Sequence, residues 1–148
     1  MAGATLEFDF TLDDREAQRR LRQLIARGES FAPMLADIGE YLDLAHRERW
    51  DNQVSPDGEP WKPLKASTVK RKQRKGRDRG ILIESGDLRD LLRYQIEGNE
   101  LAFGSDRIYG ATQQFGDEDR GIPARAWLGF SREDVLAIED IVKDYVGL

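Results

Sequence analysis

The clearest pattern of apolar and polar positions in this chain lies between Ser30 and Trp50. Apolar residues recur there every three or four positions, the spacing that gathers side chains on one face of an α-helix: Phe31, Met34, Leu35, Ile38, Leu42 and Ala45, with Tyr41 beside them. Ser30 is suited to cap this helix, and Pro33 falls in its first turn, where proline is tolerated. The pattern predicts a long helix that ends near Trp50 and lies against a sheet.

Two segments before it predict a strand and a second helix. Thr5 to Phe10 alternates between polar and apolar positions, which is typical of a short strand. A helix is expected next, capped by Asp13 or Asp14 and ended by Gly28. Its apolar face consists of four residues: Ala17, Leu21, Leu24 and Ile25.

The second half of the chain predicts a hairpin and a terminal helix. Tyr94–Ile96 and Leu101–Phe103 are separated by Gly98-Asn99, a sequence typical of a tight turn between strands. Ser131, followed three residues later by Asp134, indicates a capping box. The apolar stripe of the helix that starts there comprises Val135, Ile138, Ile141, Val142 and Tyr145.

The remaining chain predicts shorter elements and loops. Short helices are expected at Ser67–Lys75, at Leu88–Leu92 after Ser85-Gly86-Asp87, and at Tyr109–Phe115, with loops at Asn52–Pro63 and Asp117–Gly121. Strands and helices are mixed without a repeating βαβ rhythm, so we expect an α+β fold. In it a small antiparallel sheet packs against the long helix and the C-terminal helix. The chain is interpreted as one domain, 1–148, in which residues 62–80 form a basic insertion, either a short helix or a mobile loop.

Charge is distributed unevenly along the chain. It has 23 basic and 28 acidic residues, a net charge of −5. The stretch from Lys62 to Arg79, termed the basic segment, holds nine lysines and arginines and one acid, Asp78, which leaves 14 basic and 27 acidic residues elsewhere. Three interpretations of this segment stay open: a solvated loop, contact with the phosphates of a nucleic acid, or docking on an acidic protein surface.

Composition argues against several classes of protein. There is no cysteine, which suits a reducing cytoplasm, and only one histidine, His46, which we expect to be a partly exposed helix residue. No phosphate-binding loop, serine-nucleophile or zinc-protease motif is present. Asp117, Glu118 and Asp119 are expected to form a solvated loop. We therefore expect no enzyme, no metal and no cofactor, and neither a membrane partner nor export by a signal peptide.

Two residues outside the lysine and arginine run are further candidates for partner contact. Trp61 stands between Pro60 and Pro63 and fills either the core of its own domain or the pocket of a neighbour. Arg125 lies in an extended segment after Pro123, and we expect its guanidinium to be exposed and able to pair with a carboxylate. Trp127 and Phe130 are expected to be core residues covered by the C-terminal helix.

Five motifs in a fixed order resemble a known family. They are PDGEPWKPL (Pro56–Leu64), ILIESGDL (Ile81–Leu88), FGSDRIYG (Phe103–Gly110), QFG (Gln114–Gly116) and IPARAWLGFS (Ile122–Ser131). The set resembles the phage virion morphogenesis family of Mu-like and P2-like phages, from about Phe31 to the C-terminus. The family pattern has a Tyr-Ala pair and a histidine before the QFG motif. Here Gly110 follows Tyr109, and Gln113 stands at the histidine position.

The resemblance implies a structural protein of tail completion or head–tail joining. Such relatives form a ring, commonly hexameric, at the head-proximal end of the tail, where they cap the tail tube and dock it to the head connector. The implied partners are further copies of the chain, tail tube and connector proteins, with DNA nearby in the channel. The implied location is the virion, after synthesis in the host cytoplasm. The alternative is a DNA-binding accessory phage protein. We expect partner contacts from Trp61, Lys70, Arg71, Lys72, Arg74, Lys75, Arg77, Arg79 and Arg125.

Overall fold

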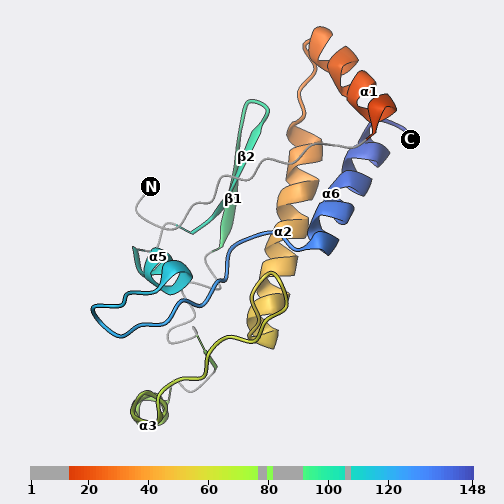
Figure 1. Cartoon of the computed structure of the whole chain (residues 1–148). Helices are drawn as coiled ribbons and strands as arrows, with labels where there is room; N and C mark the ends of the chain where they lie inside the picture. The colour runs from red at the N-terminus through yellow and green to blue at the C-terminus, as the bar shows by residue number, and fades with distance from the viewer. Residues whose placement is uncertain (1–13, 77–79, 82–91, 106–107) are drawn as a thin grey trace.

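The structure is a computed structural model that describes residues 14–76, 80–81, 92–105 and 108–148 (Figure 1). The described helices are α1 (Arg15–Ala26), α2 (Ala32–Asn52), α3 (Ala66–Arg74), α5 (Ile108–Phe115) and α6 (Arg132–Tyr145), and the described strands are β1 (Arg93–Glu97) and β2 (Glu100–Gly104). These helices and the antiparallel strand pair confirm the predicted α+β class. The strand predicted at Thr5–Phe10 and most of the helix predicted at Leu88–Leu92 lie outside the described residues.

Helix α2 is the element on which the hairpin and α6 pack. Five residues of the predicted apolar stripe are buried and form one cluster with Ile138 and Val142 of α6: Phe31, Met34, Leu35, Ile38 and Leu42. Ala45 and Tyr41 are half-buried. The hairpin lies on one side of α2 and α6 on another (Figure 1), so the prediction that this helix lies against the sheet is confirmed. The predicted cap is wrong by one residue, because Phe31 occupies the N-cap position. The Ser30 hydroxyl instead accepts a hydrogen bond from the Ala32 N–H (3.1 Å).

The predicted hairpin is confirmed, with Tyr94 paired to Phe103 and Ile96 to Leu101. These four side chains are half-buried and alternate with exposed positions, as expected for a sheet with one face on a core. At the turn, the side-chain oxygen of Asn99 accepts a hydrogen bond from the Phe31 N–H (3.1 Å). The hairpin is therefore fixed to the start of α2 as well as to its side.

The contact between Gly39 of α2 and Tyr94 of β1 leaves no room for a side chain. A Cβ on Gly39 would lie 2.5 Å from Cγ of the Tyr94 ring, and the Tyr94 hydroxyl is held by a hydrogen bond to Glu40 (2.6 Å). Helix propensity alone predicts that Gly39→Ala stabilises the protein by about 1 kcal/mol. We expect the opposite, a loss of about 1–3 kcal/mol from overpacking, measured by urea unfolding. A stabilised Gly39→Ala variant would contradict this close packing.

Helix α6 begins in the predicted capping box and joins α2 through a polar network. The Ser131 hydroxyl accepts from the Asp134 N–H (3.0 Å), and the Asp134 carboxylate accepts from the Ser131 N–H (2.9 Å). That carboxylate also accepts from the Tyr41 hydroxyl (2.8 Å) and forms an ion pair with Arg49. Burial, followed by the bond to Asp134, raises the pKa of Tyr41 to about 12. Asp134 thus caps α6 and binds it to α2 at the same time.

Helix α1 packs near the C-terminal end of α6. Its predicted cap is confirmed at Asp14, whose carboxylate accepts from the Ala17 N–H (2.9 Å). The Arg20 guanidinium donates to the carbonyls of Val146 and Gly147 (2.8 and 2.9 Å) just after α6, where a helix presents partial negative charge. Of the four predicted apolar positions of this helix, Ala17 is fully buried, whereas Ile25 is 56% exposed.

A second apolar cluster lies at the C-terminal end of α2. It consists of Trp50, Trp61, Leu92, Trp127 and Leu128. Trp50 packs edge-on against Trp61 with ring centres 5.3 Å apart. The Trp127 indole N–H donates to the Gly110 carbonyl of α5 (2.9 Å), so Trp127 is a core residue as predicted, but it contacts α5. Phe130 packs against the cluster shared by α2 and α6.

His46 is buried, which contradicts the prediction that it is partly exposed. It is 1% exposed. Its Nδ1 lies 2.7 Å from the Leu42 carbonyl, its Nε2 accepts from the Gly129 N–H (3.3 Å), and its ring centre is 4.6 Å from that of Phe103. The neutral imidazole therefore links α2, β2 and the segment before α6. Burial, followed by the charge of Arg49, lowers the pKa of His46 to about 4.

The depressed pKa of His46 predicts that stability falls in mild acid. Above the unfolded-state pKa of about 6.5, His46 is neutral in both the folded and the unfolded chain. Between that pH and about pH 4, the imidazole is protonated in the unfolded chain but stays neutral in the folded chain. We expect the free energy of unfolding to fall by about 2 kcal/mol between pH 7 and pH 5. A His46→Phe variant should lose most of this slope. A folded-state titration of the single imidazole near pH 6.5, followed by NMR, would contradict this account.

Candidate interaction site

Helix α3 carries positive charge along one face. With 3.6 residues per turn, four basic residues of the predicted set fall on the same side, here termed the cationic face of α3: Lys70, Arg71, Arg74 and Lys75. Arg71 is half-buried and the other three are exposed. The helix predicted at Ser67–Lys75 is confirmed as α3, but Ser67, which suits a cap, lies within the helix because Lys65 occupies the N-cap position. Ser67 is exposed on the cationic face.

Lys72 lies on the other side of α3 and is not a surface residue. It is 4% exposed, and its ammonium donates to the Gly80 carbonyl (2.6 Å). The expectation that Lys72 faces a partner is wrong, since its charged end is turned inward and hydrogen-bonded to backbone. Arg77 and Arg79 lie outside the described residues, so their contacts stay a prediction. Lys72 holds the back of α3 to the chain that follows it.

Trp61 fixes the chain just before the basic segment. It is 6% exposed, and its indole N–H donates to the Ala126 carbonyl (2.7 Å). Of the two alternatives from the sequence, the structure supports the core of its own domain. Because the ring is enclosed, Trp61 positions the basic segment and its side chain is not offered to a neighbour.

Arg125 is a second anchor of the basic segment. The expectation of an exposed guanidinium is wrong, since Arg125 is 7% exposed. Its Nε donates to the Lys62 carbonyl (2.8 Å) and its Nη2 to the Pro63 carbonyl (3.2 Å). Burial lowers the pKa of Arg125. The guanidinium donors of Arg125, whose planar arrangement would suit a carboxylate, instead bind the carbonyls of two successive residues at the start of the basic segment.

Gln114 completes this anchorage and was not predicted as important. Its amide donates to the Leu128 carbonyl (2.9 Å), and its side-chain oxygen accepts from the N–H groups of Trp127 and Leu128 (2.9 and 3.0 Å). The buried Gln114 side chain thereby makes hydrogen bonds to the backbone of the segment that carries Arg125 and Trp127, as a neighbouring strand would. Gly116 follows with φ +76°, and a Cβ there would lie 2.8 Å from the Ala124 nitrogen. Both residues belong to the QFG motif.

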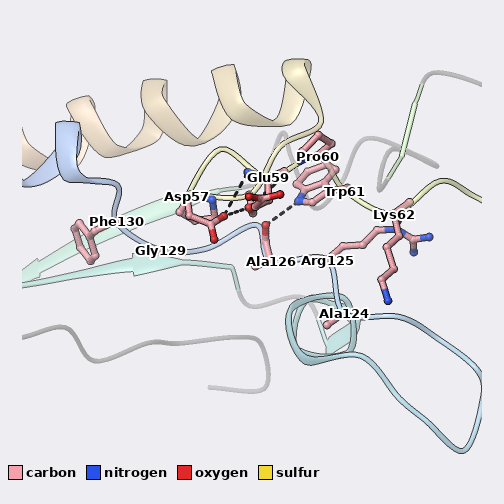
Figure 2. A pocket seen from close by; sticks show the side chains of 12 residues that line it. Asp57, Glu59, Pro60, Trp61, Lys62, Ala124, Arg125, Ala126, Gly129 and Phe130 are labelled. Atoms are coloured by element: carbon pink, nitrogen blue, oxygen red, sulfur yellow. Dashed lines mark hydrogen bonds between the residues drawn. The ribbon is translucent and has the colours of Figure 1, made fainter.

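An open groove of about 470 Å³ lies between the loop before the basic segment and the extended segment before α6 (Figure 2). Trp61 and Arg125 line it where the two segments are joined. Asp57 and Glu59 line the groove from the loop, and Lys62, the first residue of the basic segment, lines it as well (Figure 2). The residues that line it include neither a histidine nor a cysteine. The groove offers mixed charge and apolar walls, and the hydroxyl of Ser55 in its lining donates a hydrogen bond to the Asp57 carboxylate.

The family model of the phage virion morphogenesis family matches residues 12–147. The chain belongs to the phage virion morphogenesis family. This is a structural family, so the protein has a role in building the phage particle and is virion-associated. No curated protein and no solved structure matches the chain significantly.

In this phage protein the described parts of four of the motifs meet at the tryptophan cluster. Trp61 donates to the Ala126 carbonyl, and Trp127 is hydrogen-bonded to Gln114 and to Gly110. The two departures from the family pattern concern positions that act through their backbone. Gly110 supplies its carbonyl to Trp127, and Gln113 supplies its carbonyl to the Arg125 N–H (2.7 Å). A change of side chain there leaves these bonds available.

The acidic loop after α5 pairs internally. Asp117 accepts from the Arg120 guanidinium (2.7 Å), and this bond lowers the pKa of Asp117. Among the described residues, no group of three or more histidine, cysteine, aspartate or glutamate side chains is arranged to hold a metal ion. Within the same residues, no helix is long and apolar enough to cross a bilayer.

Proposed function

We propose that this phage virion morphogenesis protein forms a ring at the head-proximal end of the tail and joins the tail to the connector of the filled head. The observation that supports the proposal is that hydrogen bonds fix the position of α3. Trp61 and Arg125 hold the start of the basic segment to the body by hydrogen bonds, and Lys72 holds the back of α3 to Gly80. The cationic face is left outward. A helix fixed in this way is suited to a defined contact, because less conformational freedom is lost on binding.

The proposed mechanism is surface complementarity between charged faces. The cationic face of α3 meets acidic surface on another protein of the junction, either a further copy of the chain or a ring partner. Six copies are the expected number, following the relatives that the sequence resembles. Contact with DNA in the channel is the weaker alternative, because DNA slides through during ejection and many phosphate contacts would retard it.

A DNA-binding accessory role is the second candidate. It is favoured by the described part of the basic segment, which has seven basic residues and no acid between Lys62 and Lys75. Titration of duplex DNA at several salt concentrations distinguishes the two. Submicromolar binding at physiological salt with a steep salt slope would favour the accessory role, whereas a joining protein should bind weakly and without preference.

Immunogold labelling of purified virions tests the joining proposal. An antibody raised against this chain should place gold at the junction between head and tail. Label confined to the capsid shell, the baseplate or the unassembled fraction would contradict the proposal.

A further inference from the structure

The exposed side of α6 carries a row of carboxylates. Glu133, Asp140 and Asp144 are separated by seven and four residues, which places them on one face of the helix. All three are exposed, and Leu136 beside them is 52% exposed. These three acids are here termed the acidic stripe of α6. They point away from Ile138 and Val142, which pack on α2.

Neither the acidic stripe nor the exposed residues of the cationic face, Lys70, Arg74 and Lys75, are explained by the folding of one chain. Within the described residues, none of the three carboxylates forms an ion pair. Asp140 and Asp144 are four residues apart, as are Lys70 and Arg74 on α3, and like charges at this spacing weaken a helix. Local rules of this kind are broken at functional sites more often than elsewhere. Each row therefore indicates a partner of opposite charge.

We propose that the acidic stripe of α6 binds the cationic face of α3 of a second copy of this chain. The inference rests on the proposed ring and names its contact surfaces. The stripe from Glu133 to Asp144 is about 16 Å long at 1.5 Å per residue, and the cationic face from Lys70 to Lys75 spans about 8 Å. The stripe is thus long enough to receive the whole face. Leu136 gives the aliphatic parts of the lysine and arginine side chains an apolar surface to cover.

The two surfaces belong to opposite parts of the molecule. Figure 1 places α3 at the end farthest from α1, whereas α6 runs beside the part of α2 that is nearer to α1. The anchors at Trp61 and Arg125 hold the start of the basic segment at that far end. The α3 of one chain is therefore directed away from its own α6. A contact between unlike surfaces repeats from copy to copy and closes into a ring when the rotation permits.

Cysteine cross-linking in assembled particles tests the proposed contact. The chain has no cysteine, so introduced thiols are the only ones, and Ser67→Cys with Leu136→Cys labels both surfaces while keeping every charge. Treatment of virions with a short bis-maleimide should give a ladder of covalent multimers. Each single variant should give monomers, as should the control pair Ser67→Cys with Glu118→Cys, which places the second thiol on the exposed loop after α5. Monomers alone from the first pair, in particles that contain the protein, would overturn the inference and leave the proposed function standing.

Exchange of the charges is the second test. Glu133→Lys with Asp140→Lys and Asp144→Lys should lower the plaque titre about a hundredfold or more, because like charges then face each other. Adding Lys70→Glu, Arg74→Glu and Lys75→Glu, all at exposed positions, should restore most of it. The control reverses Glu97, Glu100 and Glu118, which gives the same net charge on other exposed positions and should leave the titre unchanged. No rescue by the exchanged charges in a folded protein would overturn the contact. Absence of the protein from mature particles would overturn the proposed function together with it.

Discussion

Replacing Lys70, Arg71, Arg74 and Lys75 by glutamine should stop tails from attaching to heads while the protein stays folded. The expected plaque titre is lower by about a hundredfold or more, because the charged surface that binds a junction partner is removed. The free energy of unfolding should change by less than about 1 kcal/mol, since Lys70, Arg74 and Lys75 are exposed and Arg71 alone is half-buried. Plaque assays and thermal unfolding by circular dichroism measure the two effects.

The matched control removes the same charge elsewhere. Arg15, Arg22, Arg27 and Arg93 are all exposed and lie on α1, at its C-cap and on β1. Their replacement by glutamine should leave the titre within a few-fold of the original. An unchanged titre in the α3 variant, or an equal loss in the control, would show that the cationic face has no specific role. Lys72 is left out of the first set because it is buried and its loss would disturb the seating of α3.

Asp134→Ala should be the most destabilising single substitution on α6. It removes the acceptor of the Tyr41 hydroxyl and of the Ser131 N–H, and it leaves the Arg49 guanidinium without its ion-pair partner in a largely buried place. Breaking such a pair from one side costs about 3–5 kcal/mol. That is a large part of the roughly 5–15 kcal/mol that holds an ordinary domain folded.

Urea unfolding measures this cost, and Asp140→Ala is the matched control on the same helix. Asp140 is exposed, so its substitution should change the free energy of unfolding by less than about 0.5 kcal/mol. A cost below about 1 kcal/mol for Asp134→Ala would mean that the network of Asp134, Tyr41 and Arg49 does not join α6 to α2.

Elements with a strong local signal could be predicted from the sequence. The apolar stripe of α2, the hairpin around Gly98-Asn99 and the capping box of Ser131 and Asp134 are each encoded within a few residues. The structure confirms all three. The family resemblance could also be seen, because its motifs occur in order over most of the chain.

The prediction that His46 is partly exposed follows its charged neighbours in the sequence and not its spacing along the helix. Arg47 and Glu48 beside it suggested an exposed position, yet His46 lies four residues after Leu42 and four before Trp50. Both of those residues are buried. The helical spacing therefore places the imidazole on the buried face, and the Gly129 N–H gives its second nitrogen a partner.

Lys72 and Arg125 could not be placed from the sequence. Their partners are the backbone carbonyls of Gly80 and of Lys62 and Pro63, and any residue type supplies a carbonyl. No pattern of side chains marks such a bond. A basic residue that anchors backbone therefore looks the same in the sequence as one that meets a partner, and only the path of the chain distinguishes them.

The most direct test of the joining role is electron microscopy of negatively stained lysates from the phage, or the induced prophage, with this gene deleted. We expect filled heads and separate complete-length tails, with joined particles restored when the gene is supplied from a plasmid. Intact virions in the deletion lysate would contradict the joining role.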